Sequence, residues 1–378
     1  MFKLILSSIF LIPLCGVIHN FYQPVWYTQY LGMLLFLFCI LGIYLKRLDK
    51  YLSYFYLLCI FSTFFVANLS PRAIVLLFNF GLCGLASYQI SKLGHEERKK
   101  ITYAILGLVL LQGILVLLQS YNLDPIFNSI SNPGKDDTVG FAGSKDFIGS
   151  FFALTFPVSL SIHPLLALIN LAGLCLSRSS FAFVAGIVSG LFYLFHTSKK
   201  IFYISLASFA LCGLIFFTQC DKLRMADFQA RGNVWKHAIQ STVKGQIEIK
   251  KENLIMVNSN SLLGFGFGNF QTLFPYVPPQ QGFNYSDEKF THAHNDYIEA
   301  FFELGWIGLI GIGLFLFGIV KSFVKIIKTK ETILYASCLL AIGLNCIGNF
   351  LFQNAVCGML IILFYGMYKG SLRGTDTV

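Results

Sequence analysis

Residues 291–320 read THAHNDYIEAFFELGWIGLIGIGLFLFGIV, and this stretch decides how the chain folds. From residue 296 onward it is apolar except for a few carboxylic acids near its start, and as a helix it is long enough to cross the roughly 30 Å hydrocarbon core of a bilayer. His292 and His294 lie just before it. The sequence therefore predicts a membrane-spanning helix with ionisable imidazoles at its mouth.

The rest of the composition agrees with a membrane protein. The 378 residues are 56% hydrophobic and 12% charged, whereas soluble domains carry about 25% charged residues. We predict an all-α, polytopic integral membrane protein with a single membrane domain over 1–378 and about twelve transmembrane helices. The predicted spans are 3–19, 28–45, 51–69, 72–91, 101–120, 147–162, 164–177, 179–196, 201–218, 296–320, 332–349 and 353–368.

The distribution of basic residues predicts the orientation of these spans. Placing both termini in the cytoplasm puts most Lys and Arg residues on the cytoplasmic side, as the positive-inside rule requires. The short outer loops then hold only Arg72, Lys135, Lys145 and Arg178. The net charge of +10 is therefore interpreted as a topology signal and a source of contacts with anionic membrane lipids, with no nucleic acid as partner.

Metal and cofactor chemistry are not indicated by any motif. The ten cysteines fall mainly inside apolar spans, without metal-ligand spacing or an evident disulfide pair, and are interpreted as small packing residues. We expect no metal and no cofactor.

The long segment 219–295 is expected to be an ordered, helical loop on the outer face. Apolar residues at helical spacing around Arg231 and Trp235 predict an amphipathic helix that Arg231 opens. Gly and Phe then alternate over 264–270, which predicts a tight turn with close backbone approach. A dinucleotide fingerprint is not favoured, because no preceding strand in a βαβ unit is predicted.

Residues around the predicted helix start could carry chemistry. His294 could accept a proton from an alcohol as a general base, or it could only cap the helix. His292 could orient a substrate or be an ordinary loop residue. Asp296 could hold the imidazole tautomer, but an N-cap role is favoured for it. Glu299 and Glu303 share one helix face, and structural pairing is favoured over catalysis for both.

Three arginines on the outer side are candidates for binding phosphate. Arg178 lies between two predicted spans and could grip phosphate oxygens bidentately or reach lipid headgroups. Arg231 could close on the same phosphate or lie on a solvated helix face. Arg72 is favoured as a headgroup anchor, with a supporting role at a diphosphate as the alternative.

The motif His294-Asn295-x9-Gly305-x-x-Gly308 resembles the signature of bacterial O-antigen ligases and their polymerase relatives. The Ser-Arg element at 177–178, the arginine-tryptophan pair at 231 and 235 and the glycine turn at 264–270 are also similar to that family. The resemblance runs from about residue 177 to residue 308, and residues 1–140 match only in being apolar.

This resemblance implies a glycosyltransferase of the bacterial inner membrane, active at the periplasmic face in lipopolysaccharide biosynthesis. It would move glycan from undecaprenyl diphosphate to a hydroxyl of the lipid A core oligosaccharide, with inversion and without metal. His294 would be the general base, Arg178 and Arg231 would bind the diphosphate, and Asn295 would belong to the motif. We expect these groups to meet in one pocket.

Two alternatives within the family remain open, since the acceptor could be another glycan, as for O-antigen polymerases, or a protein hydroxyl, as for protein O-oligosaccharyltransferases. The alternative of another class is a lipid or solute transporter without catalysis. Transporters place charges and helix breaks near the bilayer midplane, whereas this chain gathers its charges in the outer loops.

Overall fold

The computed structural model describes residues 59, 81, 83–121, 123, 138, 140–142, 144–218, 222–251, 253–274, 292–326 and 329–373. The predicted spans 3–19 and 28–45 lie outside this part, as do nearly all of 51–69, the start of 72–91, and Arg72. The described residues fall into two compact units. The first takes in most of 86–218 and 329–373, and the second takes in 222–274 and 292–322.

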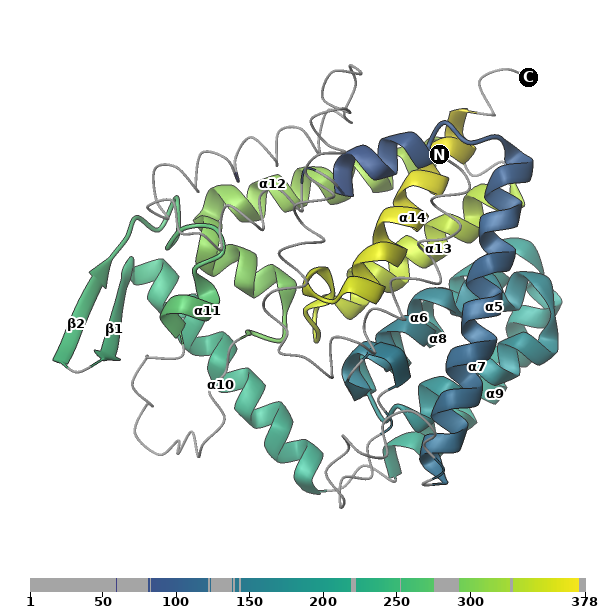
Figure 1. The fold of residues 1–378 in the computed structure, drawn as a ribbon, viewed down its shortest axis with the longest axis horizontal. Helices are drawn as coiled ribbons and strands as arrows, with labels where there is room; N and C mark the ends of the chain where they lie inside the picture. Colours follow the sequence, from purple (N-terminus) through teal and green to yellow (C-terminus); the bar gives the residue numbers. More distant parts are fainter. Residues whose placement is uncertain are drawn as a thin grey trace. The chain divides into compact units, whose positions relative to one another are not determined.

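The first unit is built of helices that coincide with the predicted spans. They are α5 (His95–Ser120), α6 (Lys145–Ile162), α7 (Pro164–Leu176), α8 (Ser180–Thr197), α9 (Lys199–Thr218), α13 (Lys330–Asn345) and α14 (Ala355–Arg373), with short 3-10 turns at Gly140–Ala142 and Leu351–Gln353 (Figure 1). Within the described residues, α5 and α8 of this unit and α12 (Asp296–Ile326), most of which lies in the second unit, are long and apolar enough to cross a membrane. The predicted all-α membrane fold is therefore confirmed for this part of the chain.

Helix α6 lies at the centre of the first unit and packs against α5, α7, α8, α13 and α14. Small residues let the helices approach closely: a Cβ added at Gly149 would lie 2.7 Å from the Ser177 hydroxyl. The buried Asn170 of α7 donates to Thr155 Oγ1 at 2.9 Å and to Ser159 Oγ at 3.0 Å, both on α6. Close backbone contact and hydrogen bonds between helices hold this unit together, as is usual where lipid gives no hydrophobic driving force.

The second unit contains α10 (Lys222–Lys244), a hairpin of β1 (Gln246–Lys251) and β2 (Asn253–Asn258), the short α11 (Phe270–Leu273) and α12 (Asp296–Ile326) (Figure 1). The strands pair antiparallel, with Ile247 opposite Val257. The amphipathic helix expected in this segment is confirmed as α10. The hairpin is an addition to the expected helical loop, and because its two strands pair antiparallel it forms no βαβ unit.

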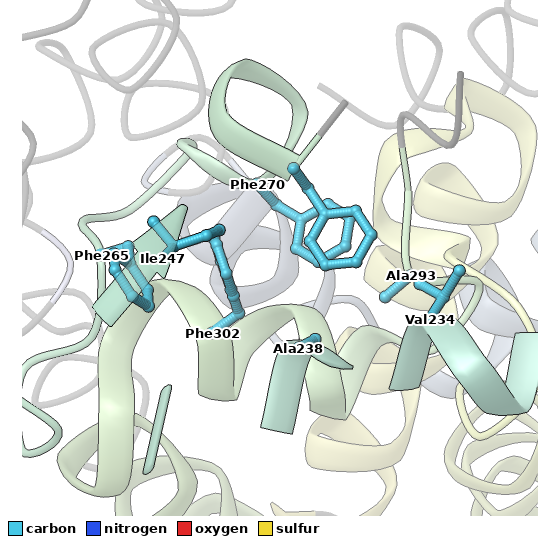
Figure 2. Packing of buried hydrophobic residues seen from close by; sticks show 8 residues of the cluster. Val234, Ala238, Ile247, Phe265, Phe270, Ala293 and Phe302 are labelled. Carbon is cyan, nitrogen blue, oxygen red and sulfur yellow. The ribbon is translucent and has the colours of Figure 1, made fainter. Parts of the chain in front are cut away.

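A cluster of aromatic rings forms the core of the second unit. Phe265 stacks on Phe302 with ring centroids 4.7 Å apart, and Phe270 stacks on Phe274 at 4.6 Å. Phe302 also meets Phe270 edge-on at 5.0 Å, so one α12 side chain joins both stacks (Figure 2). Val234, Ala238, Ile247 and Ala293 complete the buried cluster. The core thus ties α10, β1, the glycine turn and the start of α12 into one body.

Helix α12 is broken at Gly305, where φ is 61° and ψ is −156°. Residues 261–266, which include the start of the glycine turn, enter this break. Trp306 N donates to Ser261 O at 3.1 Å and Ile307 N to Leu262 O at 3.2 Å, instead of to the carbonyls four residues earlier in α12. Those carbonyls, of Phe302 and Glu303, accept from Phe265 N and Gly266 N, each at 2.9 Å.

The turn therefore replaces two helical hydrogen bonds with four bonds to its own backbone. The predicted span 296–320 lies within α12, and the structure adds a break to it: a short helical segment from Asp296 to Leu304 precedes the break, and the long apolar segment follows it. Gly264, Gly266 and Gly268 all have positive φ, which confirms the predicted tight turn with close backbone approach.

Candidate active site

His294 lies in a strained backbone conformation. Its φ is 49°, in the left-handed region that residues with a side chain seldom adopt. Among the described residues the only other non-glycine residue with positive φ is Arg178, at 55°. Such a conformation costs about 1–2 kcal/mol and persists only where the surroundings hold it, and it is concentrated at functional sites. The two residues with this conformation are His294, which the sequence predicts as a general base, and Arg178, which it predicts as a phosphate-binding residue.

Asn295 caps the short helical segment that follows His294. Its Oδ1 accepts from Tyr297 N and from Ile298 N, each at 3.0 Å, and its side chain is buried. This corrects the assignment of the cap to Asp296, which is the first residue of α12. The nine residues between Asn295 and Gly305 in the motif form the short helical segment that Asn295 caps and that the break at Gly305 ends. The length of this segment therefore accounts for the spacing of the motif.

His292 uses both ring nitrogens in contacts within the second unit. Its Nδ1 lies 3.3 Å from Glu299 Oε1, and its Nε2 is a hydrogen-bond partner of the Gln271 side-chain amide. A proton on Nδ1 would satisfy both contacts, with Gln271 donating to Nε2. These contacts hold His292 in place within the second unit, and its role in orienting a substrate stays a prediction.

The two buried glutamates of α12 accept backbone hydrogen bonds. Glu299 Oε2 accepts from Ala293 N at 3.3 Å, and Glu303 Oε1 accepts from Phe270 N at 3.0 Å. Glu303 thereby joins α12 to the start of α11, while Glu299 reaches the residue before His294. Both contacts agree with the favoured structural interpretation of these side chains.

Arg231 lies in the middle of α10, which begins at Lys222, so the expectation that it opens this helix is wrong. Its side chain is 6% exposed, which excludes the solvated-face alternative. One turn further along α10, Trp235 Nε1 donates to Ala293 O at 2.6 Å. Arg231 and His294 therefore lie on segments that this hydrogen bond joins directly.

Arg178 lies exposed in the connection between α7 and α8, as the sequence predicted. The serines on either side of it are buried and tied down. Ser177 Oγ donates to Leu174 O at 2.8 Å, and Ser179 Oγ donates to Asp146 Oδ1 at 2.8 Å. The anchored serines hold the backbone on either side of Arg178, and the exposed guanidinium projects from that backbone.

Sequence reasoning did not find Asp146, Gln271 or Trp235 as parts of these arrangements. Trp235 stood out only through its spacing from Arg231, and Gln271 gave no signal. Long-range partners of this kind follow from the fold, and local sequence does not reveal them.

No group of three or more potential metal ligands occurs in the part of the chain that the structure describes. His294, Arg231 and the two glutamates belong to the second unit, and Arg178 belongs to the first.

The comparison with protein families gives one match. Residues 165–313 match the family described as O-antigen ligase. This segment contains Arg178, Arg231, the glycine turn and the whole His-Asn-x9-Gly-x-x-Gly motif, so the resemblance inferred from the sequence is confirmed for it. The match indicates a membrane protein with glycosyltransferase-type activity. No curated protein sequence matches the chain.

Proposed function

We propose that this protein is an O-antigen ligase-type glycosyltransferase of the bacterial inner membrane. It transfers a glycan from undecaprenyl diphosphate to a hydroxyl of the lipid A core oligosaccharide at the periplasmic face, without a metal. His294 is the general base of this proposal, and Arg178 and Arg231 bind the diphosphate.

The observation that supports this proposal most strongly is the backbone conformation of His294 and Arg178. Both are in the left-handed region although neither is glycine, at φ values of 49° and 55°. A sequence free to relax would place glycine or asparagine at such positions. The presence of a histidine and an arginine there supports the proposal that their side-chain chemistry outweighs the conformational cost.

The proposed reaction is one displacement at the anomeric carbon. The acceptor hydroxyl oxygen forms a bond to this carbon while His294 takes the hydroxyl proton. The bond from the carbon to the diphosphate oxygen breaks, and the electron pair leaves with the diphosphate. Attack opposite to the leaving group inverts the anomeric configuration. General-base assistance of this kind contributes about 10²–10⁴-fold in rate.

The leaving group explains the need for guanidinium groups. Negative charge grows on the diphosphate as the bond breaks, and fixed positive charges stabilise that charge more than they stabilise the ground state. Arg231 is held in a nearly buried position on α10, and Arg178 is presented between two anchored serines. Guanidinium is also the side chain best shaped for bidentate contact with phosphate oxygens.

The test is transfer by purified protein in lipid vesicles. A glycan linked to undecaprenyl diphosphate is supplied with lipid A core, with a second lipid-linked glycan or with an acceptor protein, and the products are identified by mass. Glycan attached to lipid A core, with release of undecaprenyl diphosphate, would support the ligase. Elongated lipid-linked glycan would instead identify a polymerase, and glycosylated protein a protein O-oligosaccharyltransferase.

Movement of the donor across the vesicle membrane without any glycosidic bond formed would contradict the enzyme and support the transporter. This outcome is detected by the access of the lipid-linked glycan to a lectin outside the vesicles. The same preparation measures both results, so that one protein sample decides between the two classes.

A further inference from the structure

The backbone of Ala293, the residue before His294, is held by side chains from two different helices. Ala293 N donates to Glu299 Oε2 of α12 at 3.3 Å, and Ala293 O accepts from Trp235 Nε1 of α10 at 2.6 Å. Ala293 itself is 1% exposed and packs in the aromatic core of the second unit (Figure 2). Both backbone polar groups of one loop residue are therefore fixed from outside the loop.

Glu299 is in turn held in place by its surroundings. It is 5% exposed, and His292 Nδ1 lies 3.3 Å from its Oε1. The Gln271 side-chain amide contacts the other nitrogen of the same ring. A carboxylate that is buried and contacted on one oxygen has little freedom to swing, so that its contact to Ala293 N has a defined direction.

The residue after His294 is fixed as well. Asn295 is buried and its Oδ1 accepts from two amides of the first turn of α12. His294 is thus the one residue between an anchored peptide and a helix cap. Its left-handed φ is the backbone rotation that joins these two fixed points.

We propose that Trp235 and Glu299 are positioning residues for His294, which act by holding the Ala293 peptide and thereby setting the direction of the imidazole. The inference rests on the proposed function, since it matters only if His294 takes part in transfer. Trp235 also lies one turn from Arg231 on α10. The same indole hydrogen bond therefore sets the position of the base relative to one of the arginines.

The expected effect of losing this hydrogen bond is on turnover. Displacement of a base by about 1 Å costs on the order of 100-fold in rate, because the reacting atoms must be aligned. Donor binding does not use the Ala293 peptide, so it should hardly change. If Trp235 had only a structural role, its loss would lower the stability of the protein but would not lower kcat selectively while the donor KM stayed the same.

The experiment compares two identical substitutions at different tryptophans. Trp235→Phe keeps an aromatic ring and removes the indole N–H. Trp306→Phe is the matched control, because Trp306 is 47% exposed and its indole makes no hydrogen bond in the described part of the chain. We expect Trp235→Phe to lower kcat by about 10- to 100-fold with donor KM within about twofold, and the control to leave both unchanged. Thermal unfolding is measured for both variants.

Glu299→Gln and Glu299→Ala provide a second, independent pair. Glutamine keeps an oxygen that can accept from Ala293 N, whereas alanine removes it. The positioning role predicts that Glu299→Gln retains much of the kcat that Glu299→Ala loses. Equal losses in the two variants would contradict it.

The single variants are then repeated in the His294→Ala background. A residue that acts through His294 has no further effect once the imidazole is gone, so the losses must be non-additive. This comparison also decides the case in which Trp235→Phe lowers both kcat and the midpoint of unfolding. A full additional loss in the His294→Ala background overturns the inference, as does a Trp235→Phe variant with the kcat of the Trp306→Phe control.

Failure of the inference is distinguishable from failure of the proposed function. Normal turnover in His294→Ala itself would overturn both. Loss of turnover in His294→Ala together with a fully active Trp235→Phe would overturn only the positioning role.

Discussion

The break in α12 gives the sharpest prediction on structure, through the substitution Gly305→Ala. Gly305 has φ of 61°, and an added Cβ would lie 2.6 Å from Gly264 N and 2.6 Å from Leu262 C, with Ser261 O closer still. These are backbone atoms of the inserted turn, so no side chain can move aside. The turn must therefore leave the break, or the helix must distort around it.

The cost follows from two contributions. A left-handed conformation for a residue with a Cβ costs about 1–2 kcal/mol. Displacing the turn weakens the four backbone hydrogen bonds at Ser261, Leu262, Phe302 and Glu303, each of which contributes about 1 kcal/mol. The sum is about 5–6 kcal/mol if all four hydrogen bonds are lost, a large fraction of the stability of one unit.

The assay is thermal unfolding of the purified protein in detergent, together with the transfer rate. Gly313→Ala is the matched control, since Gly313 lies in the same helix and a Cβ there would meet nothing within 4 Å. We expect Gly305→Ala to lower the midpoint clearly and to abolish transfer, because the glycine turn and the short helix after His294 lose their connection. Gly313→Ala should be neutral or slightly stabilising. Equal behaviour of the two variants would refute the broken helix.

Three further predictions concern single side chains. Arg178→Lys keeps the charge and removes the planar fork, so transfer should fall sharply with normal membrane insertion; unchanged turnover would reduce Arg178 to a headgroup anchor. Asn295→Ala should cost about 1 kcal/mol in unfolding free energy through the lost cap, while Asn295→Asp should retain most of it. Partial burial raises the pKa of Glu331, but hydrogen bonds and charges from Arg98 and His95 outweigh it and hold the pKa below its usual value. The stability that this lowered pKa provides is present above about pH 4.3 and is lost as the pH falls through the folded-state pKa. The difference in unfolding free energy between wild type and Glu331→Gln should therefore disappear at acid pH in unfolding curves. A difference independent of pH would contradict this expectation.

The helices of the first unit were predictable because their signal is local. Apolar runs bounded by polar or charged residues marked 101–120, 147–162 and 332–349 within a few residues of the helices observed. Membrane helices satisfy their own backbone hydrogen bonds, so composition and length alone predict them.

The hairpin could have been predicted, because Gln246, Ile247, Glu248 and Ile249 alternate polar and apolar residues with the period of a strand. The burial of Ile247 and the exposure of Met256, which pairs with Glu248, follow that alternation. The strand period covers only a few residues there, whereas the helical spacing around Arg231 and Trp235 is the stronger local signal in this segment.

The break at Gly305 and the positions of the site residues could not be predicted from local sequence. The helix break depends on a turn that lies about 40 residues earlier in the chain and enters α12 through backbone atoms. The burial of Arg231 and the contact from Trp235 to Ala293 likewise depend on how α10 packs in the second unit. The motif identified His294 as a base, whereas its left-handed conformation became evident only in the fold.

In the proposed reaction His294 takes the proton of the acceptor hydroxyl. The single-turnover transfer rate of His294→Ala tests this role, measured on protein whose membrane insertion and thermal unfolding match those of wild type. We expect the rate to fall by about 10²–10⁴-fold with donor binding preserved. A transfer rate equal to that of wild type would contradict it.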